Sequence, residues 1–194
     1  MNPVYLFIGQ SGAGKGTQVA LLKERLLKDN ANTKFFFLET GEKFRELIAG
    51  NTHTATLTRE LMSKGILPPP FLAIHIWSHL LIENYDGNTT VFIDGTPRVP
   101  AEVPLLLSAA EFYGWTINIL YLNVSDEWST NHLKGRARAD DTDERIAGRI
   151  AWFHASVEPS MELLKESPLV RFHEINGEQH IEDVHRDVCA SIGI

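Results

Sequence analysis

The chain has 194 residues, of which 43% are hydrophobic and 22% charged, and its formal net charge is -7. This length and composition suit one globular domain with a substantial core. The negative charge argues against binding nucleic acid through bulk electrostatics. A single cysteine, Cys189, excludes an internal disulfide and suits a reducing cytoplasm. No apolar stretch reaches membrane length, and the N-terminal run is too short for a signal peptide. We expect a cytoplasmic monomer with no nucleic-acid or membrane partner.

Short apolar runs alternate with segments of helical spacing along the chain. The runs cover residues 4–8, 34–38, 90–93, 117–124 and 169–175, and the main helical segments cover 17–28, 101–113 and 142–165. The first four runs are nearly all apolar, which is typical of strands buried on both faces of a sheet. The last run carries Arg171, His173 and Glu174, which favours an edge strand. This alternation predicts an α/β fold, with a parallel sheet covered by helices.

Two polar interruptions follow strands and are expected to form flaps. After the second run come two or three short helical segments, 42–49, 55–63 and 71–83, broken at Gly50 and at residues 65–70. After the fourth run, residues 135–141 form a polar, basic turn between two helices. Open α/β sheets bind ligands at the carboxyl ends of their strands. We therefore expect both interruptions to lie over a site at that edge.

The stretch GQSGAGKGTQ, residues 9–18, separates the first apolar run from the first helical segment. Its glycines at 9 and 14 and Lys15 have the P-loop spacing, in the strand–loop–helix context that this pattern requires. Glycines let successive backbone N–H groups surround a phosphate, and the following helix adds its positive end. Lys15 can reach the outer phosphates. The stretch indicates a phosphate site; the alternative is a tight turn with an exposed lysine.

A carboxylate and a set of arginines suit the same chemistry. Asp94 ends the third apolar run, where it can hold magnesium directly or through water. Five arginines lie beside predicted junctions of loops and helices: Arg45, Arg98, Arg136, Arg138 and Arg149. Phosphoryl transfer depends mainly on positioning and charge neutralisation, which such a set can provide.

Two other groups of residues are expected to be structural. His75 and His79 are four apart on a mostly apolar helix, which favours packing or surface residues over metal ligands. Asp140 and Asp141 resemble a catalytic carboxylate pair. However, Asp141 followed by Glu144 three residues later is the pattern of a helix cap, so we expect a cap at this position.

Six segments in sequence order resemble motifs of the adenylate kinases, within the nucleoside monophosphate kinases. They are GQSGAGKGTQ (9–18), ETGEKFR (39–45), KGILP (64–68), DGTPR (94–98), RADDTDERIAGR (138–149) and INGEQ (175–179). In the family's P-loop a glycine follows the lysine and a threonine comes next, which accounts for Gly16. In the order given, the other five segments resemble family segments with known places. These bind the acceptor nucleotide, line its adenine, hold its phosphate, form the exit from the lid and border the donor adenine. Together they cover nearly the whole chain.

The resemblance implies both a fold and a reaction. The fold would be a P-loop three-layer sandwich over residues 1–194, with a five-stranded parallel sheet in the order 2-3-1-4-5. It would carry a flap for the acceptor nucleotide at 40–70 and a short lid at 133–141. The reaction would be reversible transfer of the γ-phosphoryl group of MgATP to AMP, giving two ADP, with Mg²⁺ bound together with ATP.

The resemblance also implies roles for individual residues. The ATP site would contain Gly12, Ala13, Gly14, Lys15, Gly16, Thr17, His132, Arg136, Gly177 and Gln179. The AMP site would contain Thr40, Gly41, Arg45, Ile66, Leu67, Gly95, Arg98, Glu102, Arg138 and Arg149. The catalytic residues would be Lys15, Arg98, Arg136, Arg138 and Arg149, and Asp94 would hold magnesium through water.

Several positions depart from the family pattern. Thr96 replaces a phenylalanine, which we interpret as a packing change, and His132 replaces an arginine that stacks on the donor adenine. The lid is too short for the insert that carries a zinc site in some members. Glu102 stands where a glutamine reads the acceptor adenine. An ionised glutamate can only accept hydrogen bonds, which suits the two adjacent donors of guanine; alternatively, Glu102 points to solvent.

Three other functions remain open at this point. The chain could phosphorylate another monophosphate, such as GMP, CMP or UMP, although Thr40 favours AMP because pyrimidine-specific members usually carry alanine there. It could be a P-loop kinase for a small metabolite, which would not require the arginines of both TGEKFR and DGTPR. It could also be an ATP-binding protein without activity, which would not need the full set of arginines.

Overall fold

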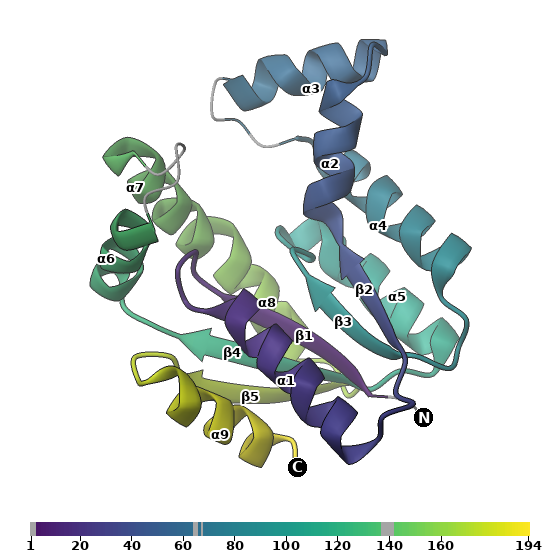
Figure 1. The fold of residues 1–194 in the computed structure, drawn as a ribbon. Coiled ribbons are helices and arrows are strands. Elements are labelled where there is room, and N and C mark those ends of the chain that lie inside the picture. Colours follow the sequence, from purple (N-terminus) through teal and green to yellow (C-terminus); the bar gives the residue numbers. More distant parts are fainter. Residues whose placement is uncertain (1–2, 64–65, 67, 137–141) are drawn as a thin grey trace.

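The computed structural model describes residues 3–63, 66, 68–136 and 142–194 (Figure 1). Its five strands form one parallel sheet in the order β2-β3-β1-β4-β5. They are β1 (Val4–Gly9), β2 (Phe35–Glu39), β3 (Thr90–Asp94), β4 (Ile117–Asn123) and β5 (Val170–Asn176). Each strand lies within one residue of its predicted bounds at either end. The strand order expected from the family resemblance is confirmed.

Helices cover both faces of the sheet and make a three-layer sandwich (Figure 1). They are α1 (Lys15–Asp29), α2 (Thr40–Ala49), α3 (His53–Ser63), α4 (Pro70–Asn84), α5 (Val103–Tyr113), α6 (Asp126–Arg136), α7 (Asp143–Trp152), α8 (Glu158–Lys165) and α9 (Ile181–Ser191). A 3₁₀ turn, η1 (Pro100–Glu102), precedes α5, and a π turn, η2 (Phe153–Val157), joins α7 to α8. Among the described residues no helix has the length and apolar character needed to cross a membrane.

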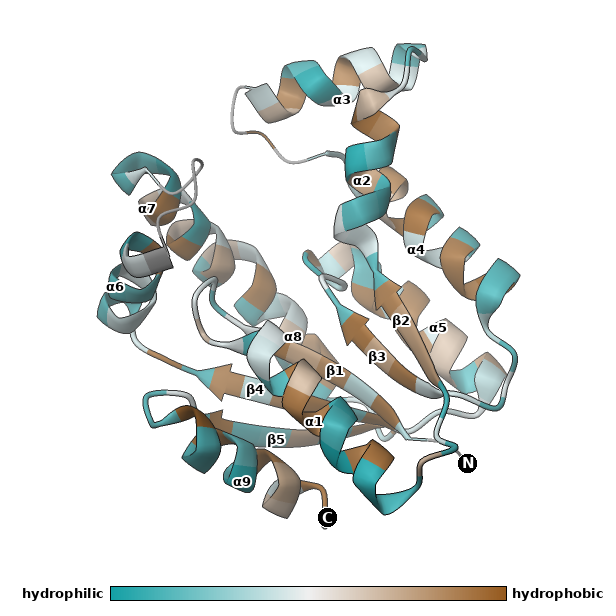
Figure 2. Cartoon of the chain, viewed as in Figure 1, coloured by the Kyte–Doolittle hydropathy of each residue, from teal (hydrophilic) through white to brown (hydrophobic). Residues whose placement is uncertain are grey.

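The core consists of two apolar layers, one on each face of the sheet (Figure 2). One layer packs the strands against α4, α5 and α8, through residues such as Trp77, Leu106 and Leu164. The other packs them against α1 and α9, through Leu22 and Val188. Both layers pack against the strands along their length. The loops that follow the carboxyl ends of the strands are therefore presented by a fixed frame.

The sequence interpretation of β2 as a strand buried on both faces was wrong. This strand pairs only with β3 and forms one edge of the sheet, where Phe37 is 40% exposed. An apolar run cannot by itself distinguish a central strand from an edge covered by a long side chain. Here Lys23 Nζ of α1 lies 5.5 Å from the centre of the Phe37 ring. The polar strand β5 forms the opposite edge, as predicted.

The helical segments differ from their predicted forms at three places. Residues 142–165 do not form one regular helix, because the π turn interrupts them. The cap of α7 is Thr142, whose Oγ1 accepts from the backbone N–H of Arg145 at 3.4 Å, so the prediction of an Asp141–Glu144 cap was wrong. The prediction also omitted α9, which begins at Ile181 after the last strand.

Candidate active site

The P-loop leads from β1 into α1 and folds around its own lysine. Gly14, in the left-handed region at φ 87°, precedes Lys15, the first residue of α1. The Lys15 Nζ donates to the carbonyl oxygens of Gly9 at 2.7 Å and Gln10 at 3.1 Å. A Cβ on Gly12 would lie 3.1 Å from the Ser129 carbonyl oxygen, so glycine lets the loop approach α6 closely. Gly12, Ala13, Gly14, Lys15, Gly16 and Thr17 all belong to this turn or the first turn of α1.

A cavity of about 330 Å³, which we call the P-loop cavity, lies at the carboxyl ends of β1 and β3. Lys15 lines it from the P-loop and Asp94 from the end of β3. Arg98 reaches it from the loop after β3, and Arg149 from α7. Three of the five predicted catalytic cations thus lie around one cavity with one carboxylate. Such a concentration of positive charge suits a polyanionic ligand.

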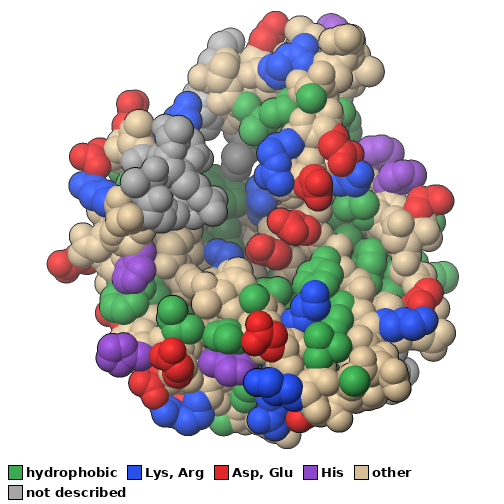
Figure 3. All heavy atoms as spheres, viewed as in Figure 1, with side chains coloured by type: hydrophobic (Ala, Val, Ile, Leu, Met, Phe, Trp, Pro, Cys, Tyr) green, Lys and Arg blue, Asp and Glu red, His purple; other side chains and the backbone are tan. Residues whose placement is uncertain are grey.

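A second cavity of about 630 Å³, which we call the flap cavity, lies between α2, α4 and the loop after β3. Five residues predicted for the acceptor site line it: Gly41, Arg45, Ile66, Arg98 and Glu102. Most of the remaining wall is apolar, with Phe44, Ile48, Met62 and Val99 among its residues. Figure 3 shows the surface hollowed between the projecting α2–α3 pair and the α6–α7 side, with basic side chains nearby.

Arg98 and Trp152 line both cavities, so the two cavities adjoin. Arg98 is one of the predicted acceptor residues, whereas sequence reasoning missed Trp152. Trp152 lies three residues after Arg149 in α7, a spacing that places both side chains on the same side of a helix. This spacing is the sequence signal that could have identified it.

Thr40 and Gly95 connect the ends of β2 and β3. Thr40 is buried at the start of α2, and its Oγ1 lies 3.4 Å from the Gly95 carbonyl oxygen. Gly95 adopts φ 82° and lines the P-loop cavity, while Thr40 lines neither cavity. In this structure Thr40 therefore positions the strand ends instead of facing the space in which a ligand would lie.

Glu102 is buried, with 2% of its surface exposed, so the alternative in which it points to solvent was wrong. Its Oε2 accepts from Thr96 Oγ1 at 2.7 Å and from the Arg98 backbone N–H at 3.3 Å. Burial raises the pKa of the carboxyl, while the hydrogen bonds from Thr96 and Arg98 lower it to a smaller extent. The interpretation of Thr96 as a packing change was also wrong, because its hydroxyl is the hydrogen-bond partner of Glu102. The two departures from the family pattern are therefore one interacting pair.

His132 lies beside the P-loop, 3.5 Å from where a Cβ on Gly12 would lie, and both His132 and Gln179 have protein partners. The His132 ring stacks on Trp128 of the same helix at 4.3 Å and 24°, and its Nδ1 lies 3.0 Å from the Trp128 carbonyl oxygen. Gln179 Nε2 donates to the Asn176 carbonyl and to Asp187.

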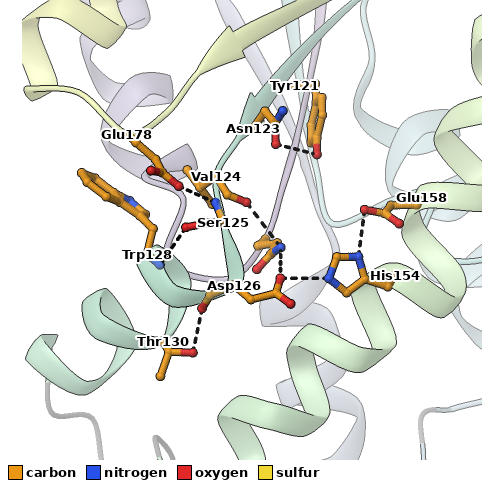
Figure 4. Close-up of polar contacts among 11 residues, drawn as sticks. Tyr121, Asn123, Val124, Ser125, Asp126, Trp128, Thr130, His154, Glu158 and Glu178 are labelled. Atoms are coloured by element: carbon orange, nitrogen blue, oxygen red, sulfur yellow. Dashed lines mark hydrogen bonds and ion pairs between the residues drawn. The ribbon is translucent and has the colours of Figure 1, made fainter.

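The segment from Gly177 to Gln179 lies against the end of β4 and the start of α6. The Gly177 N–H donates to the Asn123 carbonyl at 2.8 Å, and Glu178 Oε1 accepts from the Ser125 N–H (Figure 4). The segment around Glu178 therefore lies against the start of α6, the helix that carries His132. Trp128, the aromatic side chain under His132, was missed by the sequence reasoning.

Three predicted site positions cannot be placed by their side chains. Leu67 and Arg138 lie outside the described residues, as does most of the polar turn after α6. Arg136 is the last residue of α6, and only its backbone is described.

His75 and His79 lie on the exposed face of α4, as predicted for packing or surface residues. Their rings stack at 5.9 Å between centres and 11° between planes. Within the described part of the chain, no three histidine, cysteine, aspartate or glutamate residues are grouped as metal ligands would be.

A strand–P-loop–helix unit in a 2-3-1-4-5 sheet, with cations around the loop, defines a P-loop kinase. A family model described as an AAA domain matches residues 8–147. An adenylate kinase of Prochlorococcus marinus is 32% identical over 93% of this chain and 93% of its own length. Another, from Leuconostoc mesenteroides, is 31% identical over 94% of this chain and 93% of its own. The chain belongs to the adenylate kinase family.

Proposed function

We propose that this protein transfers the γ-phosphoryl group of MgATP to AMP and catalyses the reverse reaction of two ADP. The observation that carries this proposal is the adjacency of the two cavities. A phosphate-binding loop lines one, a mostly apolar chamber forms the other, and Arg98 lines both. A transfer enzyme needs a donor phosphate and an acceptor nucleotide side by side. The names of its relatives support the same reaction.

The chemistry requires cations and positioning, with no protein nucleophile. We assign Lys15 and the P-loop amides to the donor phosphates, and Arg45 and Arg98 to the acceptor phosphate. Arg149 would stabilise the charge that spreads over the transferring group, because it lines the P-loop cavity from α7. Arg136 and Arg138 are assigned to the same task from the sequence motif.

The residues present fit a magnesium ion bound with ATP. Asp94 ends β3 inside the P-loop cavity, beside Ser11 and Lys15. Its carboxylate oxygens are hard ligands of the kind that Mg²⁺ prefers. Bound magnesium would neutralise phosphate charge and orient the β- and γ-oxygens. Asp94 would hold it through water.

We assign residues 40–70 to the acceptor flap and 133–141 to a short lid. The α2–α3 pair projects away from the sheet, and the α6–α7 pair rises opposite it (Figure 1). Closure of both over the bound nucleotides would exclude water, which would otherwise compete with AMP as the acceptor.

A broader acceptor range is the second candidate, and Glu102 is the observation that favours it. The neutral carboxyl can donate to N1 of adenine, whereas the ionised carboxylate can only accept, for example from N1–H of guanine. Oε2 is already held by Thr96 and the Arg98 N–H, which leaves Oε1 for a base in the flap cavity. We expect AMP to be the best acceptor, with detectable use of GMP.

A panel of acceptors tests both proposals. Coupled detection of ADP formation would be run with MgATP alone and with AMP, GMP, CMP or UMP. We expect AMP-dependent ADP formation, a lower kcat/KM for GMP, and little activity without an acceptor. ATP turnover that is independent of every monophosphate would overturn the proposed reaction. A pyrimidine preference would overturn the assignment of Glu102 to an adenine acceptor.

A further inference from the structure

Four polar side chains from separate segments form one hydrogen-bonded series that starts in the P-loop. Figure 4 shows its part from Asp126 through His154 to Glu158. Gln10, in the P-loop itself, is 4% exposed, and its Nε2 donates to Asp126 Oδ1 at 2.7 Å. The same Oδ1 lies 2.9 Å from His154 Nε2, and His154 Nδ1 lies 2.9 Å from Glu158 Oε1. The series therefore links the P-loop to the first residue of α6, the π turn and the first residue of α8.

Both ring nitrogens of His154 face carboxylates, so the imidazolium, with an N–H on each nitrogen, satisfies both contacts. Hydrogen bonds to Asp126 and Glu158 raise the pKa of His154. Hydrogen bonds from His154 and Gln10 lower the pKa of Asp126. Geometry and charge therefore agree that His154 is the cation of the series.

Among the residues that the structure describes, the other ionisable groups near His154 do not supply a competing cation. Asp126 and His154 line a cavity of about 500 Å³ between α6 and α7. Lys134 and Asp143 line it as well, and they form an ion pair with each other at 2.9 Å. Tyr121 of β4 stays neutral, because burial, followed by the charges of Glu158 and Glu174, raises its pKa to about 12.

The backbone at His154 is also specialised. The residue belongs to the five-residue π turn Phe153–Val157, between two α-helices. Such turns are rare and occur often at functional sites, since the extra residue redirects the side chains around it. In Figure 4 the His154 ring lies between Asp126 and Glu158. The π turn is thus the local feature that presents this side chain to α6.

Gln10 connects this series to the catalytic lysine. Its carbonyl oxygen accepts from Lys15 Nζ at 3.1 Å, while its side chain is held by Asp126. We propose that His154 is a positioning residue for the donor phosphates: held between Asp126 and Glu158, it fixes Gln10, and with it the P-loop, against α6 and α8. This proposal rests on the proposed function, because it assumes that the P-loop holds ATP.

The bridge that the charged His154 ring forms between Asp126 and Glu158 should depend on pH in a defined direction. The pKa of His154 is raised above its ordinary value near 6.5, so the bridge is complete below that value. It is lost as the pH rises through the raised pKa. The affinity for MgATP should therefore fall as the pH rises through the pKa of His154. The side chains of Asp126 and His154 are 57% and 42% exposed, so we expect a change of about two- to fivefold.

Calorimetric titration with MgATP tests the proposal on the whole chain between about pH 6 and 9, across the histidine range. The quantity compared is the ratio of variant to wild-type Kd at each pH, since the titration of ATP itself cancels in this ratio. His154→Gln should bind about two- to fivefold more weakly at the lowest pH and approach wild type at the highest. His154→Arg can donate to both carboxylates without titrating, so it should keep the tight binding at every pH. His79→Gln, on the exposed face of α4, is the matched control.

Two outcomes would overturn the role of His154. The first is a His154→Gln ratio that does not change with pH, including a ratio of one with or without a loss of thermal stability. The second is a His154→Arg variant that behaves like His154→Gln, which would show that the charge is not used. If wild type binds no MgATP, the proposed function fails as well. If wild type binds MgATP and the ratio is flat, only the role of His154 fails.

Discussion

The P-loop cavity and the flap cavity share Arg98 and Trp152 but differ in the rest of their walls. Lys15, Asp94 and Arg149 give the first cavity a dense set of charges. The second is lined mainly by apolar side chains, and the charged residues among its described lining are Arg45, Arg98 and Glu102. In the proposed reaction this difference would separate two tasks. The charged cavity would neutralise the transferring phosphoryl group, and the apolar cavity with few polar groups would select the nucleoside.

Replacing the lysine of the P-loop cavity should have the largest effect. Lys15→Ala should lower kcat by roughly 10²–10³, the usual effect of losing one donor to developing charge. The measurement is steady-state kinetics with MgATP and AMP, together with a circular dichroism spectrum to establish that the fold is kept. Lys28→Ala, at the exposed end of the same helix, should behave as wild type. A Lys15→Ala enzyme with wild-type kcat would remove the assignment of phosphate chemistry to this cavity.

Arg149→Ala should come next, with kcat reduced by roughly 10² and a smaller change in Kd for either nucleotide. The reason is that Arg149 is proposed to meet charge that develops only during transfer. Arg138→Ala should show the same division between kcat and binding. Arg145→Ala, exposed on the same helix as Arg149, is the control. If Arg149→Ala raises only KM, Arg149 contributes to binding instead of transfer.

In the flap cavity, Glu102→Gln should raise the preference for AMP over GMP by about tenfold, which corresponds to one mismatched polar contact. The preference is measured as the ratio of kcat/KM values in wild type and variant. Because burial raises the pKa of Glu102, its neutral form persists to higher pH than for an exposed glutamate. The wild-type AMP preference should therefore fall as the pH rises through that pKa.

In Glu102→Gln the same ratio should not change with pH, since glutamine does not titrate. The acceptor phosphate titrates in both AMP and GMP, so its effect cancels in the ratio of their kcat/KM values. An AMP-to-GMP ratio that is equal in wild type and variant at every pH would show that Glu102 does not contact the base. The rest of the flap cavity would then select the acceptor base.

The smallest effect is expected from Thr96→Val, which removes the donor to Glu102 Oε2 and keeps nearly the same volume. Because this hydrogen bond lowers the pKa of Glu102, its loss should move the pH midpoint of the AMP preference upward. It should also lower the free energy of unfolding by about 1–2 kcal/mol, measured by urea denaturation.

Thr89→Val provides the matched control for this change. Thr89 is also buried, and its hydroxyl has no hydrogen-bond partner in the part of the chain that the structure describes. Removing that hydroxyl should not destabilise the protein. If Thr96→Val leaves both the midpoint and the stability unchanged, the Thr96–Glu102 hydrogen bond does not tune the flap cavity.

The sequence alone determined the features that consecutive residues encode. The P-loop was readable because its function depends on backbone turns made by a few neighbouring glycines and one lysine. The five strands were readable because each is a short apolar run, and Asp94 was readable because it directly ends one of them. The strand order followed from the family resemblance, since local pattern does not state which strands pair.

The tertiary structure alone decided the contacts between distant segments. Gln10 and Asp126 are separated by 116 positions and Asp126 and His154 by 28, and no local periodicity relates them. Glu102 could be placed in or out of the core only after its helix was packed and Thr96 was found beside it. Hydrophobic pattern specifies which faces are buried, but the partner of a buried polar group depends on how the packed elements meet.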